Sequence, residues 1–277
     1  MEIEDIIKAA LREDIGEGDH TSLATVPAGA VKSARMIAKE PGIVCGGEIA
    51  KQVFLTVDPT LRVDVSIADG AAVVPGTEIM RVSGSARAIL AAERTALNFI
   101  QRMSGIATKT RRLTEKIKGS RTRLLDTRKT TPLMREAEKY AVRCGGGDNH
   151  RTGLYDMILI KDNHNDFAGG VEAALRAAKR YMEATGKKLS VEIEVRNFDE
   201  LQEVLRTGVA DRIMLDNFTP DEIREALKLI GKKFETEASG GITEENIADY
   251  AATGVDFISV GALTHHIKSL DISLAAE

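Results

Sequence analysis

A glycine-rich segment contains the densest group of side chains in this chain that could do chemistry. Three consecutive glycines at 145–147 lead toward His150 and Arg151, and a short apolar segment then ends at Lys161. Glycine permits backbone conformations that a side chain forbids, and His150 beside Arg151 places a titratable donor next to a permanent bidentate cation. Such a group suits a small polyanionic ligand better than the alternative, an ordinary glycine-rich surface loop.

Short apolar segments alternate with helical patterns from residue 122 onward. This alternation predicts a parallel α/β barrel or open barrel, in which catalytic groups lie at the carboxyl ends of the strands. The predicted strands span 122–126, 157–161, 189–195, 212–216, 234–238 and 256–260. Polar or small residues follow or end them: Asp126 to Lys129, Lys161 to Asn163, Glu192 and Glu194, Asp216 and Asn217, Ser239 to Gly241, and Ser259 to Gly261.

These strand ends predict two sub-sites of opposite charge. Glu194 and Asp216 could hold sugar hydroxyls or Mg²⁺ and stabilise a positively charged transition state. The turns at 239–241 and 259–261 offer backbone N–H groups to a phosphate. A cationic set would bind an acid with more than one negative charge, and it comprises Arg128, Lys129, His150, Arg151 and Lys161. An anionic acceptor, a phosphorylated sugar and a metal together suggest phosphoribosyl transfer.

The first third of the chain has a different pattern. Apolar residues at helical spacing predict a helix over 2–13 that ends before Gly16. Strict alternation over 61–67 predicts a strand, and a second strand is predicted over 77–82. Residues 88–104 predict a helix that Gly105 divides from a second one running to about residue 118. We therefore expect a small α/β sandwich domain over 1–108 and an open parallel α/β barrel over 109–277, whose C-terminal tail packs back on the first domain.

Composition narrows the possible partners. The 277 residues carry a formal net charge of -4, which gives no overall attraction to nucleic acid or anionic lipid. The sequence has no run of about 18 apolar residues and begins with an acidic stretch, so we expect a cytoplasmic protein without a membrane partner. Cys45 and Cys144 fit no metal or redox spacing, and Cys144 is expected to be a small apolar filler.

The chain resembles the quinolinate phosphoribosyltransferase family nearly from end to end. Each motif alone is weak, but their occurrence together in this order is specific. The motifs are Glu13-Asp14-Ile15-Gly16 with Gly18-Asp19, Glu93 to Asn98, Asp126 to Pro132, the glycine-rich His-Arg segment, Lys161 to His164, Glu192 to Val195, Leu215-Asp216-Asn217, and Ser239 to Ile242.

This resemblance implies an enzyme that joins quinolinate to phosphoribosyl pyrophosphate with decarboxylation, using Mg²⁺ and no organic cofactor. It also implies a homodimer, or a higher oligomer built from it, with active sites shared between subunits, so that Arg94 reaches the acid bound by the neighbouring barrel. Glu194 and Asp216 match the ribose and Mg²⁺ side. The implied catalytic residues are Lys129, Lys161, Glu194 and Asp216. The other implied substrate-binding residues are Thr127, Arg128, His150, Arg151, Ser239, Gly240, Gly241, Ser259, Val260 and Gly261.

Several alternatives remain open from the sequence. Glu192 could exchange roles with Glu194, and a paralogue linked to molybdenum uptake could use the same scaffold for another acceptor. Lys161 could be a Schiff-base lysine, as in barrel aldolases. Residues 102–129 hold ten Lys or Arg, so a nucleic-acid contact is conceivable, although charge runs on helices are usually solvated faces and we expect no such partner.

Overall fold

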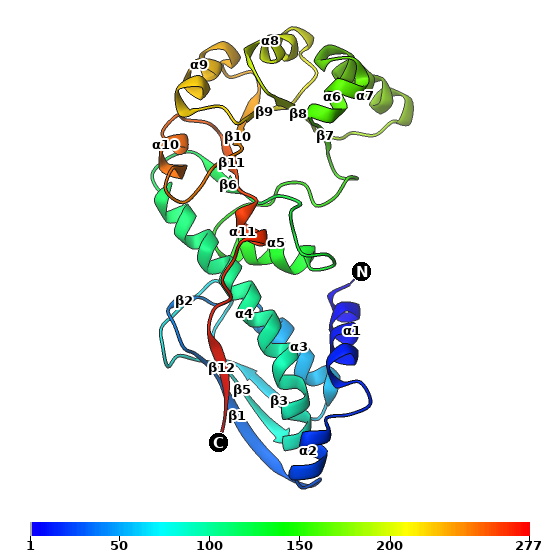
Figure 1. Cartoon of the computed structure of the whole chain (residues 1–277), viewed down its shortest axis with the longest axis vertical. Coiled ribbons are helices and arrows are strands. Elements are labelled where there is room, and N and C mark those ends of the chain that lie inside the picture. Colours follow the sequence, from blue (N-terminus) through cyan, green and yellow to red (C-terminus); the bar gives the residue numbers. More distant parts are fainter. Residues whose placement is uncertain (1) are drawn as a thin grey trace. The chain divides into compact units, whose positions relative to one another are not determined.

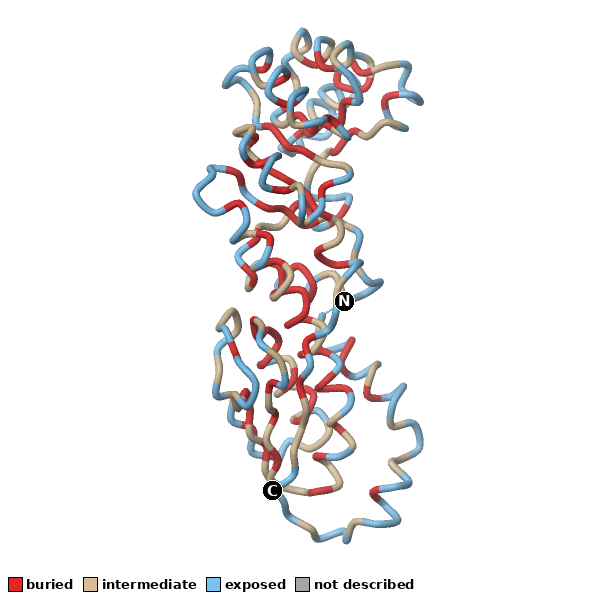
Figure 2. Tube along the Cα trace, turned by 60° about the vertical axis from the view of Figure 1, so that its left-hand side comes forward, coloured by how far each residue is buried: buried red, intermediate tan, exposed pale blue. Residues whose placement is uncertain are grey.

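The computed structural model describes residues 2–277, which form two compact units that interleave in the sequence. The first unit comprises 2–112, 130–146 and 262–277, and the second comprises 113–129 and 147–261. The predicted domains are continuous in sequence instead, and their division after residue 108 stays a prediction. Figure 2 shows buried residues along the central elements of each unit and exposed residues on the outer turns.

An antiparallel sheet forms the base of the first unit. Its strand order is β12-β1-β5-β3, where the four strands span Ile272–Ala276, Val31–Ala38, Glu78–Ser85 and Arg62–Val65. The C-terminal strand β12 pairs with β1 from Ala34 opposite Ala276 to Ala38 opposite Ile272, and the two lie side by side in Figure 1. A two-stranded ribbon of β2 (Gly42–Ile43) and β4 (Ala72–Val73) accompanies this sheet.

Helices cover this sheet and complete an apolar core. Helix α1 (Ile3–Ile15) buries Ile6, Ile7 and Leu11 and ends at Gly16, as the periodicity predicts. The remaining helices are α2 (His20–Thr25), α3 (Gly47–Val57), α5 (Arg135–Cys144), α11 (Ala262–His265) and the first part of α4 (Ala86–Lys116). The largest fully buried side chains include Phe54, Met36, Met80 and Ile100. Burial of such side chains is the main source of stability in this unit.

Helix α4 contradicts one prediction. It runs without a break from Ala86 to Lys116, so Gly105 does not divide two helices. A Cβ atom at Gly105 would lie 2.3 Å from the carbonyl oxygen of Lys268. The glycine is therefore explained by a close approach of another backbone segment, a requirement that the local sequence pattern does not reveal.

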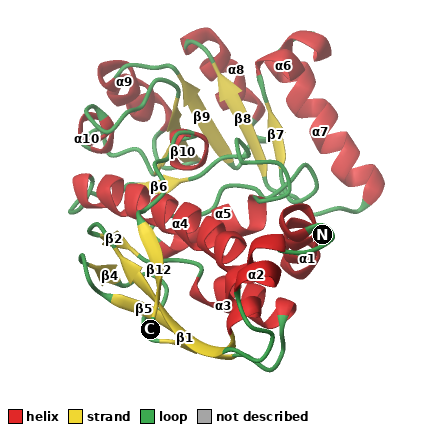
Figure 3. Ribbon diagram, turned by 60° about the horizontal axis from the view of Figure 1, so that its bottom comes forward, coloured by secondary structure: helices red, strands yellow, loops and turns green. Residues whose placement is uncertain are grey.

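The second unit is a parallel sheet flanked by helices. Its strand order is β6-β11-β10-β9-β8-β7, and the strands span Arg123–Leu125, Phe257–Ser259, Glu235–Ser239, Arg212–Asp216, Val191–Val195 and Ile158–Ile160. The outer helices, seen beside the strands in Figure 3, are α6 (Asp162–Ala168), α7 (Val171–Thr185), α8 (Phe198–Thr207), α9 (Pro220–Ile230) and α10 (Ile247–Ala251). Strands β6 and β7 are the two edges and do not pair with each other, so the predicted open parallel α/β barrel is confirmed.

Within residues 2–277, no helix combines the length and apolar character needed to cross a bilayer. The basic run at 102–129 contacts groups of the protein itself. Arg102 pairs with Glu138, Arg121 with Asp256 and Arg123 with Asp148. These cations therefore have structural partners on the folded chain.

Candidate active site

A cavity of about 330 Å³ lies at the carboxyl ends of the parallel strands. It brings together eight of the residues that the sequence predicts for the site and adds two apolar walls, Leu159 and Met214. The lining residues are Thr127, Arg128, Lys129, His150, Arg151, Leu159, Lys161, Met214, Glu237, Ser239 and Ser259. All belong to the second unit.

Cationic side chains from three separate segments share this cavity. Arg128 follows β6, Arg151 follows the glycine-rich segment, and Lys161 follows β7. Arg151 is buried, and its pKa is lowered from the usual range by desolvation and by the nearby charge of Arg128. An anion bound between the two guanidinium groups would offset their repulsion and stabilise the charged form of Arg151. This arrangement is typical of a site that binds a negatively charged ligand.

The glycine-rich segment is attached to the edge of the sheet. A parallel bridge joins Leu125 to Asp148, and the buried Asp126 accepts a 2.8 Å hydrogen bond from the His150 backbone N–H and a 2.6 Å bond from the Asn149 side chain. A Cβ atom at Gly145 would lie 2.6 Å from the carbonyl oxygen of Ala107. At this position the glycine permits packing against α4, whereas Asp126 orients His150 and Arg151.

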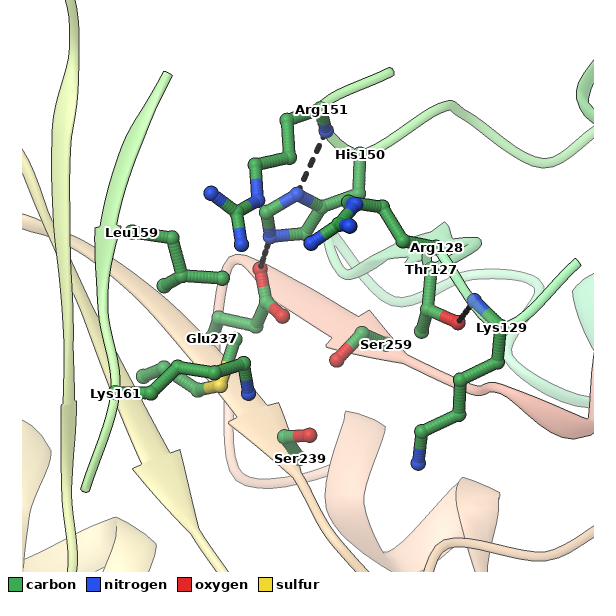
Figure 4. A pocket seen from close by; sticks show the side chains of 11 residues that line it. Thr127, Arg128, Lys129, His150, Arg151, Leu159, Lys161, Glu237, Ser239 and Ser259 are labelled. Carbon is green, nitrogen blue, oxygen red and sulfur yellow. Dashed lines mark hydrogen bonds and ion pairs between the residues drawn. The ribbon is translucent and has the colours of Figure 1, made fainter. Parts of the chain in front are cut away.

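His150 differs from the cationic donor that the sequence predicts. Its Nδ1 accepts a 2.7 Å hydrogen bond from the backbone N–H of Arg151. Because a backbone N–H can only donate, Nδ1 carries no proton, and the proton of the neutral ring is on Nε2. Nε2 lies 3.0 Å from Glu192 and 3.5 Å from Glu237, a contact that Figure 4 shows on the wall of the cavity. The ring thus enters the site as a neutral group, with Nδ1 bonded to the Arg151 backbone and Nε2 close to two carboxyl groups.

Buried carboxyl groups lie beneath this histidine. Glu192 and Glu237 are fully buried, and Arg212 approaches their carboxylates at 3.9 Å and 3.3 Å. Burial raises the pKa of Glu192 to about 7, and burial together with the charge of Glu192 raises that of Glu237 to about 7. One proton shared by two close carboxylates is the usual result of this arrangement.

A second pair of acids comprises Glu194 on β8 and Asp216 at the end of β9. Lys161 Nζ is 2.7 Å from Glu194 Oε2, and the Lys161 backbone N–H donates to His164 Nδ1 at 3.0 Å. Burial, followed by the charge of Glu194, raises the pKa of Asp216. Asp216 is opposite Ser239 in the sheet register, so the strands of the acidic pair, β8 and β9, adjoin the strand that carries Ser239.

The two small-residue turns differ in what they can offer. The Val260 N–H donates to the Leu125 carbonyl at 3.0 Å, so this N–H already has a partner in the fold, and the phosphate role of its turn stays a prediction. Gly240 packs against Asn217, whose side-chain oxygen would be 2.2 Å from a Cβ atom there. The side chains of Ser239 and Ser259 line the cavity, whereas Gly240, Gly241, Val260 and Gly261 are outside that lining set.

Arg94 belongs to the other unit. It is exposed on α4 and precedes Gln101 and Arg102 by about two helical turns. Gln101 donates a hydrogen bond to the carbonyl of Ile272, and Arg102 donates one to the carboxylate of Glu138. Gln101 and Arg102 thus contribute to the fold through these contacts, whereas Arg94 is exposed.

Sequence reasoning missed Glu237 and Arg212 and treated Glu192 only as a substitute for Glu194. The available signal was a charged residue in each of three neighbouring strand segments, Glu192 in 191–195, Arg212 in 212–216 and Glu237 in 235–239. Such residues on parallel strands point to one face. In a closed interior they need partners, so they predict a buried polar cluster rather than a wet surface.

An open parallel α/β barrel with a polar cavity at its strand ends defines an α/β enzyme that acts on small anionic substrates. Two family descriptions match the chain: "Quinolinate phosphoribosyl transferase, N-terminal domain" over residues 19–104 and "Quinolinate phosphoribosyl transferase, C-terminal domain" over residues 106–275. The chain belongs to the quinolinate phosphoribosyltransferase family.

Named relatives and solved structures agree with this assignment. Quinolinate phosphoribosyltransferase [decarboxylating] 1 of Nicotiana glauca is 45% identical over 99% of this chain and 82% of its own length. A probable nicotinate-nucleotide pyrophosphorylase [carboxylating] of Bacillus subtilis is 42% identical over 99% of this chain and 93% of its own. The solved nicotinate-nucleotide pyrophosphorylase of Francisella tularensis is 42% identical, with a TM-score of 0.93 over 99% of this chain and 96% of that one.

Proposed function

We propose that this chain transfers the phosphoribosyl group of phosphoribosyl pyrophosphate to quinolinate, releasing pyrophosphate and carbon dioxide and forming nicotinate mononucleotide for NAD synthesis. The observation that carries the proposal is the single cavity shared by Arg128, Arg151 and Lys161 at the strand ends, in a chain of this family.

The cavity suits a flat diacid. Arg128 and Arg151 offer charge-assisted hydrogen bonds to two adjacent carboxylates, while Leu159 and Met214 provide apolar surface for the pyridine ring. His150, whose ring is neutral and held by Glu192 and Glu237, keeps the Arg151 backbone in place through its Nδ1. Binding and orientation then supply much of the rate enhancement.

The sugar side is expected along the neighbouring strand ends. Glu194 and Asp216 can accept hydrogen bonds from ribose hydroxyls, and the hydroxyls of Ser239 and Ser259 can contact a phosphate. Lys161, 2.7 Å from Glu194, is close to both sub-sites. The same contact argues against the aldolase alternative, because it directs Lys161 Nζ to a carboxylate and not to a substrate carbonyl.

The reaction balances without a covalent enzyme intermediate. The pyridine nitrogen bonds to the ribose carbon as the bond to pyrophosphate breaks, and the leaving group takes the electron pair. Carboxylates near the ribose stabilise the positive charge that develops. The ring nitrogen is then cationic, so it can stabilise the electron pair left when the adjacent carboxylate departs as carbon dioxide, before that carbon takes up a proton.

Mg²⁺ fits the acidic pair by its donor chemistry. Glu194 and Asp216 provide carboxylate oxygens, the ligands this ion prefers, and Asp216 already experiences the charge of Glu194. When bound with the sugar substrate, the ion would offset the negative charge of the pyrophosphate. No organic cofactor is required by this scheme.

A shared active site belongs to the same proposal. Exposed Arg94 on α4 is proposed to complete the quinolinate pocket of a second copy of the chain in a homodimer. A cytoplasmic location is likewise part of the proposal.

Product analysis tests the proposed function. Purified protein incubated with quinolinate, phosphoribosyl pyrophosphate and Mg²⁺ should release nicotinate mononucleotide and carbon dioxide in equal amounts. Nicotinate should fail as the acceptor, because it lacks one of the two charges and the group whose loss completes the reaction. Turnover of nicotinate at a similar rate would contradict the assignment and favour a different acceptor on the same scaffold.

A further inference from the structure

The first unit brings its two cysteines together. Cys45 lies just before α3 and Cys144 is the last residue of α5, and they are about 100 positions apart in the sequence. Their sulfur atoms and a carboxylate oxygen of Asp69 all lie within 4.8 Å of one another. The spacing in the sequence gave no sign of this pair, which corrects the expectation that Cys144 is only an apolar filler.

Asp69 is already committed to the fold. One of its carboxylate oxygens accepts hydrogen bonds from the Gly46 and Gly47 backbone N–H groups at 3.0 Å each. The other accepts a 3.0 Å bond from the Tyr140 hydroxyl. A metal ion would have to compete with these three donors for the carboxylate, whereas the chemistry of the two sulfur atoms needs no ligand from Asp69. The cluster is therefore better suited to thiol chemistry than to ion binding.

The two thiols have different environments. Cys45 is fully buried, and its backbone is held on both sides by the Ser104 hydroxyl, which accepts from its N–H at 2.9 Å and donates to its carbonyl at 3.2 Å. Cys144 is partly exposed. The hydrogen bond between the two sulfurs raises the pKa of Cys45, aided by burial, and lowers the pKa of Cys144. Cys144 is thus the more accessible and more acidic thiol, and Cys45 is the buried partner behind it.

We propose that Cys144 and Cys45 form a two-thiol modification site for small-molecule disulfides, with Cys144 as the attacking thiol and Cys45 as the resolving thiol. The Cys144 thiolate attacks one sulfur of the small disulfide, forming a mixed disulfide and expelling one thiolate. The Cys45 thiol then loses its proton to solvent and attacks Cys144 Sγ, which forms the Cys45–Cys144 bond and expels the second thiolate. Two protein thiols are oxidised and one small disulfide is reduced to two thiols.

The Cys45–Cys144 bond would change the stability of the fold and would not involve the substrates of the proposed reaction. The new bond would join the end of α5 to the turn before α3, both in the first unit, and would close a loop of about 100 residues in the unfolded chain. Cross-links of this kind restrict the unfolded state. The proposal is therefore independent of the proposed catalytic function, and each can fail alone.

Oxidised glutathione provides the probe. Full-length wild-type protein treated with it should lose both titratable thiols, gain no glutathione mass, and contain a Cys45–Cys144 cross-link in a non-reducing peptide map. Its melting temperature should rise by several degrees and return to the original value after reduction. The wild type retaining both thiols, while the denatured protein reacts at both, would overturn the proposal.

Two matched variants separate the roles. Cys45→Ser should accumulate one glutathione on Cys144, because the resolving thiol is missing, and Cys144→Ser should react at least tenfold more slowly, because only the buried thiol remains. Adduct formation at equal rates in both variants would contradict the assigned order.

Discussion

The interiors of the two units differ in the kinds of side chain that they bury. The sheet and helices of the first unit enclose a core of apolar side chains such as Met36, Phe54 and Ile100. The barrel of the second unit encloses Glu192, Glu237 and the ring of His150. An apolar core can be stable at any pH in the working range, whereas buried acids must be neutralised or paired. The second unit therefore has a less stable interior than an apolar core would give, and its buried polar side chains support the candidate active site.

The largest effect is expected in the apolar core. Ile100→Ala removes a fully buried side chain from α4 and should lower the free energy of unfolding by about 2 to 5 kcal/mol. Because no titratable group is involved, the loss should be equal at pH 5 and pH 8 in urea unfolding. Leu90→Ala, at an exposed position on the same helix, is the control and should change stability by less than about 0.5 kcal/mol. A strongly pH-dependent loss in Ile100→Ala would undermine the contrast between the cores.

The barrel core should respond to pH. Burial raises the pKa of Glu192 and Glu237 from 4.5 to about 7, so the folded state holds protons that the unfolded state releases. The free energy of unfolding should therefore fall as pH rises from about 4.5 to 7, by up to about 3 kcal/mol for one carboxyl group. Glu237→Gln removes one titrating group and should reduce this slope in unfolding experiments across the window.

Glu235 provides a matched control for that experiment. It lies on the same strand and contacts the same arginine, with Arg212 at 2.9 Å, but its side chain is exposed. Glu235→Gln should leave the pH slope unchanged. If both variants had the wild-type slope, the interpretation that Glu192 and Glu237 share a proton next to His150 would be wrong.

Much of the framework for this core could be predicted from the sequence. Strand β9 begins and ends where predicted, at Arg212 and Asp216, because its apolar residues are bounded by charged ones. The convergence of Arg128 and Lys161 also followed from strand order, since parallel strands present their carboxyl ends at one edge, whereas Arg151 was expected there from the glycine-rich segment. These features depend on local pattern and on a general rule of topology.

Other features depend on contacts between distant segments. Gly105 looks like a helix break until Lys268 is seen against it. The charge of His150 depends on a backbone N–H and on carboxyl groups of two other strands. Cys45 and Cys144 become neighbours only after α5 packs in the first unit. No local periodicity encodes any of these.

The next prediction moves from the core to the cavity above it. Arg151→Ala removes a charge-assisted contact worth about 1.5 to 3 kcal/mol, which corresponds to a roughly 10- to 150-fold loss in kcat/KM for quinolinate. The KM for phosphoribosyl pyrophosphate should change much less. Arg196→Ala is the control, because Arg196 is half-exposed and pairs with Asp166 and Glu200 at the surface, and its kinetics should match the wild type. An equal loss for both substrates in Arg151→Ala would contradict its place beside quinolinate.

The smallest expected effect tests whether the first unit of one chain completes the active site in the second unit of another copy. In the proposed dimer, Arg94 of one chain serves the barrel of the other. Arg94→Ala and Arg151→Ala proteins, each impaired about tenfold or more at low quinolinate, should then reach about a quarter of wild-type activity when unfolded together and refolded, because half of the dimers are hybrids with one intact site. If Arg94 served its own barrel, every site in the hybrid would lack one arginine and no activity would return. Size-exclusion chromatography of each variant establishes that both still assemble, so a failure to recover activity would count against the shared site and not against the dimer.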